Sequence, residues 1–270
     1  MLSTPTQLMR LSQGQLNLLE ACPRKFQHTY LERLNSPSNP EQEERQTLGS
    51  RFHLLMQQQE MGLPIDSFLQ ADAKLQSWMA GFTDAAPEIL TPVSDHKTFR
   101  ESEHYRTLQV QDYLLTVVYD LLIADNQQAQ ILDWKTYPKP PHKRKLELNW
   151  QTRLYLYVLA ETSDYLPENI SMTYWFVQSE GQPQNIKFNY NNAQHIQIAK
   201  KVNQLLSQLT YWLERYQNNE QFPQVVEGSK TCDYCQFAKR CERTPATQEA
   251  VKDSLPNFDS IQEISLNPIN

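Results

Sequence analysis

No stretch of the 270-residue sequence approaches the roughly 20 consecutive apolar residues that a transmembrane helix needs. Residues 1–15 also lack the apolar centre of a signal peptide. Hydrophobic residues make up 39% of the chain, and the mean hydropathy is -0.65, values that are ordinary for a protein with a polar surface. The sequence therefore predicts a cytoplasmic protein without a membrane partner.

Positive charge is also in short supply, because 31 acidic residues outnumber 25 lysines and arginines and leave a net charge of -6. This balance argues against a protein that coats nucleic acid without discrimination. A local basic patch nevertheless exists, since residues 135–145 contain five lysines and arginines and no acid. This patch is either a solvated, proline-stiffened loop or a loop that contacts phosphate groups through Lys139, Lys143, Arg144 and Lys145.

Cysteine is scarce, and its four copies are confined to two places. Cys22 lies near the start of the chain, whereas Cys232, Cys235 and Cys241 fall within ten residues near its end. Because disulfides are disfavoured in the cytosol, this spacing favours thiolates that converge on a metal. Four thiolates can hold either zinc or a 4Fe–4S cluster, and spacing does not separate the two. A site that includes Cys22 would join the two ends of the chain and constrain the unfolded state.

Two apolar segments carry acids that need an explanation. Residues 114–123 form an apolar row interrupted by Asp120, and Asp133 ends a second run, two residues before Lys135. Side chains alternate along a strand, so Asp133 and Lys135 point the same way, about 6 to 7 Å apart. An unpaired buried carboxylate is costly, whereas two carboxylates on neighbouring strands can bind Mg2+ or Mn2+. Lys135 would then stand beside the attacking water.

The remaining pattern predicts helices and strands in one α/β domain. Helical spacing covers residues 12–34 with a break at Pro23, and also residues 48–59, 146–161 and 193–217. Alternation predicts a three-stranded antiparallel meander within residues 98–132 and a strand pair at residues 170–178 and 185–190. Residues 55–97 are expected to be a helical insertion or lid, and residues 244–270 a polar tail.

Three further polar residues fall at helical spacing near the acids. His53 could complete the metal shell and favour Mn2+, while Gln151 and Tyr155, four residues apart, could hold Lys135 or a backbone phosphate. Each also has a commoner interpretation: a satisfied histidine, a solvated Gln–Tyr pair, or an exposed Asp133–Lys135 ion pair. The joint order of acid strand, Asp-x-Lys strand, basic loop and Gln-xxx-Tyr helix is much harder to obtain by accident.

Together these motifs resemble the PD-(D/E)XK nuclease superfamily, and specifically its RecB/AddB-like branch with an iron–sulfur cluster, which includes the CRISPR-adaptation nucleases. The resemblance runs from about Leu16 to Cys241. It implies a restriction-endonuclease-like central mixed sheet flanked by helices in a single domain, residues 1–270. Residues 228–243 would bind the cluster together with Cys22.

The resemblance also implies roles for particular residues. His53, Asp120 and Asp133 would be ligands of Mg2+ or Mn2+, Lys135 the catalytic lysine, and Gln151 with Tyr155 the helix motif of the branch. The cysteines at 22, 232, 235 and 241 would hold a 4Fe–4S cluster, with zinc as the lesser alternative.

The implied activity is cleavage of DNA phosphodiesters, often as an exonuclease on single-stranded ends. It would serve DNA repair, recombination or CRISPR adaptation, with a helicase or CRISPR-adaptation complex as partner. Val117 stands where the branch usually has glycine, three residues before the metal-binding acid, and could narrow the approach of DNA. The alternative is therefore a DNA-binding or scaffolding module that keeps the fold and the cluster but cleaves poorly.

Overall fold

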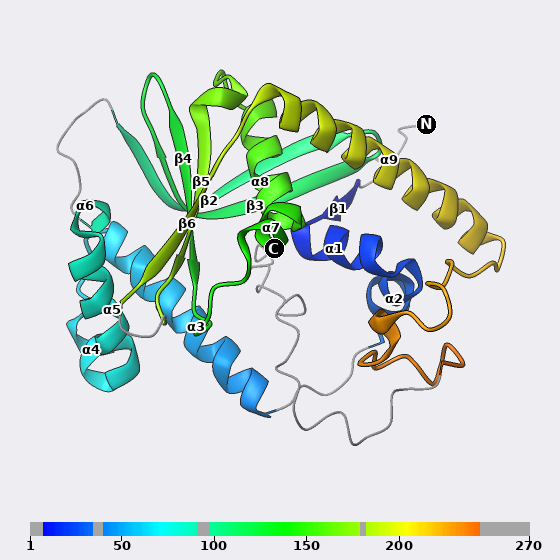
Figure 1. Cartoon of the computed structure of the whole chain (residues 1–270), viewed down its shortest axis with the longest axis horizontal. Helices are drawn as coiled ribbons and strands as arrows, with labels where there is room; N and C mark the ends of the chain where they lie inside the picture. The colour runs from blue at the N-terminus through cyan, green and yellow to red at the C-terminus, as the bar shows by residue number, and fades with distance from the viewer. Residues whose placement is uncertain (1–7, 35–39, 91–97, 179–181, 244–270) are drawn as a thin grey trace, which may run out of the picture.

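The computed structural model describes residues 8–34, 40–90, 98–178 and 182–243, in which one mixed sheet lies between two layers of helices (Figure 1). The strands of this sheet are β1 (Met9–Leu11), β2 (Phe99–Val110), β3 (Tyr113–Ala124), β4 (Ala129–Lys135), β5 (Ile170–Phe176) and β6 (Gln184–Asn189).

The helices are α1 (Gln13–Ala21), α2 (Pro23–Phe26), α3 (Pro40–Glu60), α4 (Asp66–Ala71), α5 (Ala73–Ala85), α6 (Pro87–Leu90), α7 (Lys143–Leu148), α8 (Trp150–Glu161) and α9 (Asn192–Gln217). A π-helix (Gln27–Leu31) and short 3-10 turns (Pro167–Asn169 and Lys230–Cys232) complete the regular structure of the described residues. None of the helices in these ranges is both long and apolar enough to cross a membrane.

The six strands pair in the order β1-β3-β4-β5-β6, and β2 pairs along the other edge of β3. β2 and β4 are antiparallel to β3, as the predicted meander requires, whereas β1 is parallel to β3 and β5 is parallel to β4. The antiparallel β6 closes the far edge. The predicted central mixed sheet flanked by helices is therefore confirmed.

One face of the sheet is covered by α1, α8 and α9 (Figure 1). Their apolar side chains and those of β3 and β5 belong to one main core, in which Leu154, Leu206 and Tyr119 are fully buried. The long amphipathic α9 follows the predicted range to within a residue, because its apolar stripe repeats every 3.6 residues.

The opposite face is covered by α3 and by the short helices α4, α5 and α6 (Figure 1). Phe82 of α5 makes edge-on contacts with Trp134 of β4 and Trp175 of β5, at centroid distances of 5.3 and 5.2 Å. Residues 55–90 are largely helical, and their apolar side chains form a core layer against the sheet. Residues 91–97 and the predicted tail, 244–270, lie outside the described residues.

Local sequence explains two helix boundaries, the junction of α1 with α2 and the start of α3. Cys22 ends α1 and Pro23 opens α2, because proline lacks the N–H that a first turn does not need. α3 begins at Pro40, earlier than the predicted residue 48. Its first turns consist of glutamates, glutamines and other good helix formers, which carry no apolar pattern for the sequence to reveal.

Candidate functional site

The site lies where β3 and β4 part. β3 and β4 pair over four residues each, from Leu121↔Leu132 to Ala124↔Ala129. Residues 133–135 of β4 lie beyond this pairing. Asp120 is the first residue of β3 beyond it. Its Oδ2 accepts a hydrogen bond of 2.6 Å from the backbone N–H of Trp134, so the acid bridges the two strands where their ladder ends.

The alternation of side chains along β3 shifts by one residue at Asp120. Before the acid, the odd-numbered side chains point into the main core, namely Tyr113, Leu115, Val117 and Tyr119. After it, the even-numbered Leu122 and Ala124 do so. On the neighbouring strand, Glu103 lies between the paired residues Ser102↔Leu121 and His104↔Tyr119 and has a φ of 51°. Such local departures from a regular ladder re-aim side chains and are common beside active sites.

α3 brings His53 to this point. Gly49, one turn earlier, lies so close to the end of β4 that an added Cβ would be 2.9 Å from Thr136 Oγ1. His53 Nε2 lies 3.0 Å from the Trp134 carbonyl and can donate to it, while Nδ1 lies 3.3 Å from Asp120 Oδ1. With its proton on Nε2, the imidazole presents the Nδ1 lone pair to a carboxylate oxygen. This arrangement is typical of histidine ligands of metals.

Glu103 joins the same group. Ligand atoms of His53, Glu103 and Asp120 all lie within 4.8 Å of one another, and no other such group of three occurs among the described residues. One nitrogen and two carboxylate oxygens suit Mn2+ and, less closely, Mg2+. Sequence reasoning missed Glu103, and the only available signal was its place in the strand that precedes Asp120 in the meander.

Asp133 does not belong to that group of three. It is fully buried, and Oδ1 lies 2.7 Å from the Lys135 ammonium, while Oδ2 accepts a 2.7 Å hydrogen bond from the Gln151 side chain. Lys135 is 8% exposed, and its Nζ also lies 5.5 Å from the centre of the Tyr174 ring. Gln151, near the start of α8, thus contacts Asp133, and its predicted contact with Lys135 or a backbone phosphate stays a prediction.

Tyr155 lies deeper than the sequence suggests. It is 2% exposed, its ring packs edge-on against Tyr119 at 5.2 Å, and its backbone carbonyl accepts a bond from the Tyr119 hydroxyl. The helix motif is thus no solvated pair. The predicted contact of Tyr155 with Lys135 or a backbone phosphate stays a prediction.

The predicted basic loop is half helix. Lys139 lies in the loop after β4, whereas Lys143, Arg144 and Lys145 form the first turn of α7. All four side chains are exposed. Lys143 packs over the Phe188 ring at 5.3 Å, so this basic surface adjoins β6.

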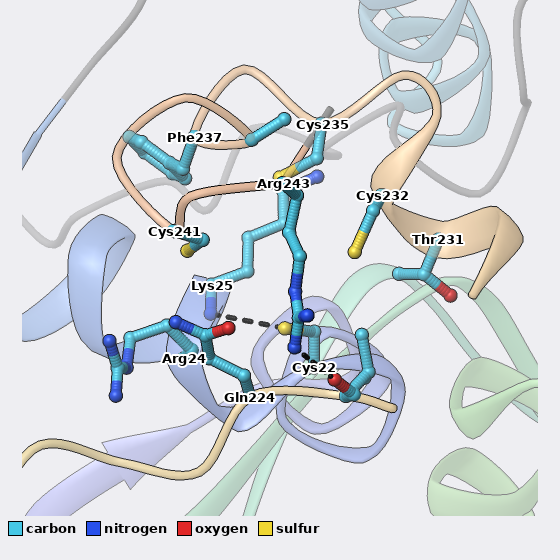
Figure 2. A pocket seen from close by; sticks show the side chains of 12 residues that line it. Cys22, Arg24, Lys25, Gln224, Thr231, Cys232, Cys235, Phe237, Cys241 and Arg243 are labelled. Atoms are coloured by element: carbon cyan, nitrogen blue, oxygen red, sulfur yellow. Dashed lines mark hydrogen bonds between the residues drawn. The ribbon is translucent and has the colours of Figure 1, made fainter. Parts of the chain in front are cut away.

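The four cysteines line one cavity that opens to solvent (Figure 2). Cys22 is 8% exposed, and its sulfur accepts a bond from the Lys25 backbone N–H. No three of the four sulfur atoms lie within 4.8 Å of one another, so the thiols surround the space without closing on a single point. Burial raises the pKa of Cys232 and of Cys241, and neighbouring thiols add to the rise.

Contacts between the two ends of the chain hold this cavity together. Arg24 donates from Nε to the Phe222 carbonyl at 2.7 Å, and the Gln27 side chain accepts from the Phe222 N–H. His28 Nε2 lies 3.8 Å from the Cys241 sulfur, while Nδ1 bonds Glu32 at 2.7 Å.

Glu32 is ionised in this setting. Burial favours its neutral form, but hydrogen bonds from Gln27 and His28 outweigh that effect and lower its pKa. The carboxylate therefore fixes the His28 ring with an N–H towards Glu32 and with Nε2 towards Cys241.

Comparison with known proteins gives one clear match. The model of the PD-(D/E)XK nuclease superfamily covers residues 10–242. Among solved structures, SSO0001 is 10% identical, with a TM-score of 0.40 over 91% of this chain and 92% of that one. A protein from Eubacterium rectale, provisionally named an exonuclease, is 12% identical, with a TM-score of 0.46 over 91% and 94%. These likenesses are remote, and no curated protein matches.

Proposed function

The chain belongs to the PD-(D/E)XK nuclease superfamily, and from this premise we propose that it is a metal-dependent nuclease that hydrolyses phosphodiester bonds of DNA. The observation that carries the proposal is that two sets of polar side chains, Asp120 with His53 and Asp133 with Lys135, lie next to each other at Trp134. The backbone of this residue bonds both Asp120 and His53, and its sequence neighbours are the buried pair Asp133 and Lys135.

The proposed metal ligands are His53, Asp120 and Asp133, and we add Glu103 to them. The donor set fits a hard divalent cation, because it offers carboxylate oxygens and an imidazole nitrogen whose partner N–H is already held by a carbonyl. Bound there, Mg2+ or Mn2+ would polarise the scissile phosphate and favour ionisation of the attacking water.

The chain's own part in the reaction centres on Lys135. Its ammonium is the cation of a buried ion pair, so it can hold the attacking water and offset the negative charge that develops at phosphorus. Asp133 fixes the ammonium, and Gln151 fixes Asp133 from the other side. Tyr155 is proposed to position this unit through its packing against Tyr119.

The substrate is proposed to be DNA with a single-stranded or free end. The exposed basic surface of Lys139, Lys143, Arg144 and Lys145 supports contact with phosphates in a chain that is acidic overall. Exonuclease action in cytoplasmic DNA repair, recombination or CRISPR adaptation, with a helicase or adaptation partner, follows from the RecB/AddB-like motifs.

The position of the Val117 side chain gives little support to the alternative of a catalytically weak module. Its side chain is 1% exposed and lies in the main core beneath α8. A side chain that packs inward does not narrow an open approach to the metal ligands. The weak-module alternative is therefore left to the activity test.

The test is degradation of end-labelled single-stranded DNA by the full chain with Mn2+ or Mg2+. We expect cleavage that chelation abolishes and that Lys135→Ala lowers by at least about a hundredfold, the scale of losing one positioned transition-state contact. Lys200→Ala, which removes an exposed lysine of α9, serves as the matched control. Thermal unfolding of each variant separates lost chemistry from lost fold.

Equal rates for the wild type and a folded Lys135→Ala protein would refute the proposed chemistry. DNA binding without turnover would instead identify a scaffolding module. Circular and RNA substrates in the same assay distinguish exonuclease from endonuclease action and DNA from RNA preference.

We also propose that the four cysteines hold a 4Fe–4S cluster, as in the iron–sulfur branch, and that residues 1–270 form a single domain. A tetrahedral zinc ion with bonds of about 2.3 Å needs sulfurs roughly 3.8 Å apart. No three thiols lie within 4.8 Å of one another here, and the preference for the cluster over zinc rests on the family resemblance. Arg24, Lys25 and Arg243 line the same cavity and offset the negative charge of four thiolates.

Anaerobic purification tests the cluster. We expect brown protein with about four irons and four sulfides per chain. Cys22→Ser and Cys241→Ser should each lose most of the iron. Colourless protein with one zinc per chain would replace the cluster by a structural zinc site.

A further inference from the structure

The cysteine cavity contains one cationic side chain with an unused donor. Arg243 follows Cys241 by two residues and lines the cavity with the four thiols, and Figure 2 shows its side chain running from beside Cys235 towards Cys22. The side chain is 18% exposed. This arginine is therefore part of the cavity wall rather than of the outer surface.

Only part of the guanidinium is occupied by other groups. Its Nη2 donates to the Val225 carbonyl at 3.0 Å, and Nη1 lies 3.6 Å from a carboxylate oxygen of Glu227, whose side chain is 90% exposed. Nε is buried and has no hydrogen-bond partner among the described residues. A buried N–H without an acceptor is destabilising, so such groups normally meet an acceptor in the functional state.

Four sulfur atoms are among the acceptors that this cavity offers. Its wall also carries the polar side chains of Gln224 and Thr231, and neither accepts from Nε. Donor and acceptors thus share one space.

Resting on the proposed cluster, we propose that Arg243 is a positioning residue whose Nε–H donates to a sulfur of the cluster or of its thiolate ligands. Hydrogen bonds to sulfur and nearby positive charge stabilise the form that carries one more electron. Arg243 therefore raises the midpoint potential of the cluster.

The experiment is a redox titration of anaerobically purified full-length protein, with dithionite as electron donor and electron paramagnetic resonance as readout. We expect Arg243→Met to shift the midpoint to a more negative potential. Arg243→Lys keeps the charge but not the Nε donor and should give a smaller shift in the same direction. Lys239→Met removes one charge from an exposed site in the same segment and should leave the midpoint near that of the wild type.

Unchanged midpoints in both Arg243 variants would overturn the proposal, as would an equal shift in Lys239→Met. If both Arg243 variants lose the cluster, Arg24→Lys protein labelled with 15N-arginine decides the question, because Arg243 is then the labelled arginine among the described residues of the cavity wall. Nitrogen hyperfine coupling in the reduced cluster supports the hydrogen bond, and its absence overturns it. Wild-type protein without iron would refute the cluster itself, which is a separate outcome.

Discussion

Glu103 stands in the middle of β2, yet its carboxylate lies with His53 and Asp120. A φ of 51° is unusual for a glutamate, and it occurs where the pairing of β2 with β3 is interrupted. The backbone irregularity and the metal-ligand geometry thus coincide at one residue.

We predict that Glu103→Gln weakens Mn2+ binding at least about tenfold, since even outer residues of metal sites have effects on this scale. The substitution keeps the size of the side chain and removes one negative charge. Calorimetric titration of the metal-free protein with Mn2+ measures the affinity.

Glu101→Gln is the matched control for Glu103→Gln. It changes the charge equally, two residues away on the same strand, at a side chain that is 52% exposed and bonded to His104. Equal affinities in the two variants would remove Glu103 from the ligand set while leaving Asp120 and His53 in place.

The Asp133–Lys135 pair has a consequence for stability. Removing Lys135 leaves a fully buried carboxylate with Gln151 as its donor. We predict that Lys135→Ala lowers the free energy of unfolding by about 3 kcal/mol, the low end for a broken buried ion pair. Urea unfolding measures this change.

The double variant Lys135→Ala with Asp133→Asn should recover part of that stability, because it no longer buries an uncompensated charge. No recovery would mean that the loss arises from packing against Tyr174 rather than from charge.

At the scale of elements, the distance between α3 and β4 depends on Gly49. An alanine Cβ there would lie 2.9 Å from the branched side chain of Thr136, so the helix or the strand end must shift. His53 follows one turn later on the same helix and would move with it. The glycine is thus explained by packing at the site.

We predict that Gly49→Ala weakens Mn2+ binding several-fold and fails to stabilise the protein. An alanine in place of a helical glycine is otherwise worth up to about 1 kcal/mol. Gly14→Ala is the control, because its nearest contact would be an ordinary 3.9 Å to Ser12. Metal titration and thermal unfolding of both variants measure the difference, and unchanged affinity in Gly49→Ala would contradict the close-approach argument.

The helices α4 to α6 pack against the sheet and form part of its second core. Phe82 packs against two tryptophans of the sheet, and Leu75 and Met79 bury the same face of α5. Trp134, the residue that bonds both Asp120 and His53, is therefore held from behind by this layer.

At the scale of the whole molecule, the two ends of the described chain meet. α2 and the π-helix after it contact residues 222–243, through Arg24 and Gln27 on one side and Phe222 on the other (Figure 1). A bound cluster would fasten this junction covalently, and closing so long a loop restricts the unfolded chain most.

The helical layer over the main core predicts a pH dependence. Burial, with a smaller contribution from Glu161, raises the pKa of Tyr157 to about 12. Between pH 10 and 12 the unfolded chain releases this proton while the folded protein retains it, so the stability present below pH 10 falls as pH rises.

We predict that the free energy of unfolding of the wild type falls by about 1 kcal/mol over that pH range because of Tyr157, and that Tyr157→Phe abolishes this fall. Urea midpoints at pH 9 and 11 measure it. Tyr105→Phe, at a side chain that is 51% exposed, should behave like the wild type. A Tyr157→Phe protein as alkali-sensitive as the wild type would disprove the assignment.

The sequence by itself determined what depends on local pattern. The apolar stripe of α9, the break between Cys22 and Pro23, the three-stranded meander and the same-facing Asp133 and Lys135 all follow from helix period, strand alternation and proline geometry. The family motifs could be recognised for the same reason, since each occupies a few neighbouring residues.

Only the tertiary structure decided what depends on contacts between distant segments. β1 is too short for a periodic signal, the Gln151 side chain reaches Asp133 from the start of α8, and Glu103 meets His53 and Asp120 where the ladder beside Asp120 is irregular. Likewise, Arg243 meets the thiols only because residues 222–243 fold back on α2. Proximity in space is set by packing and register, which alternation along a single strand does not encode.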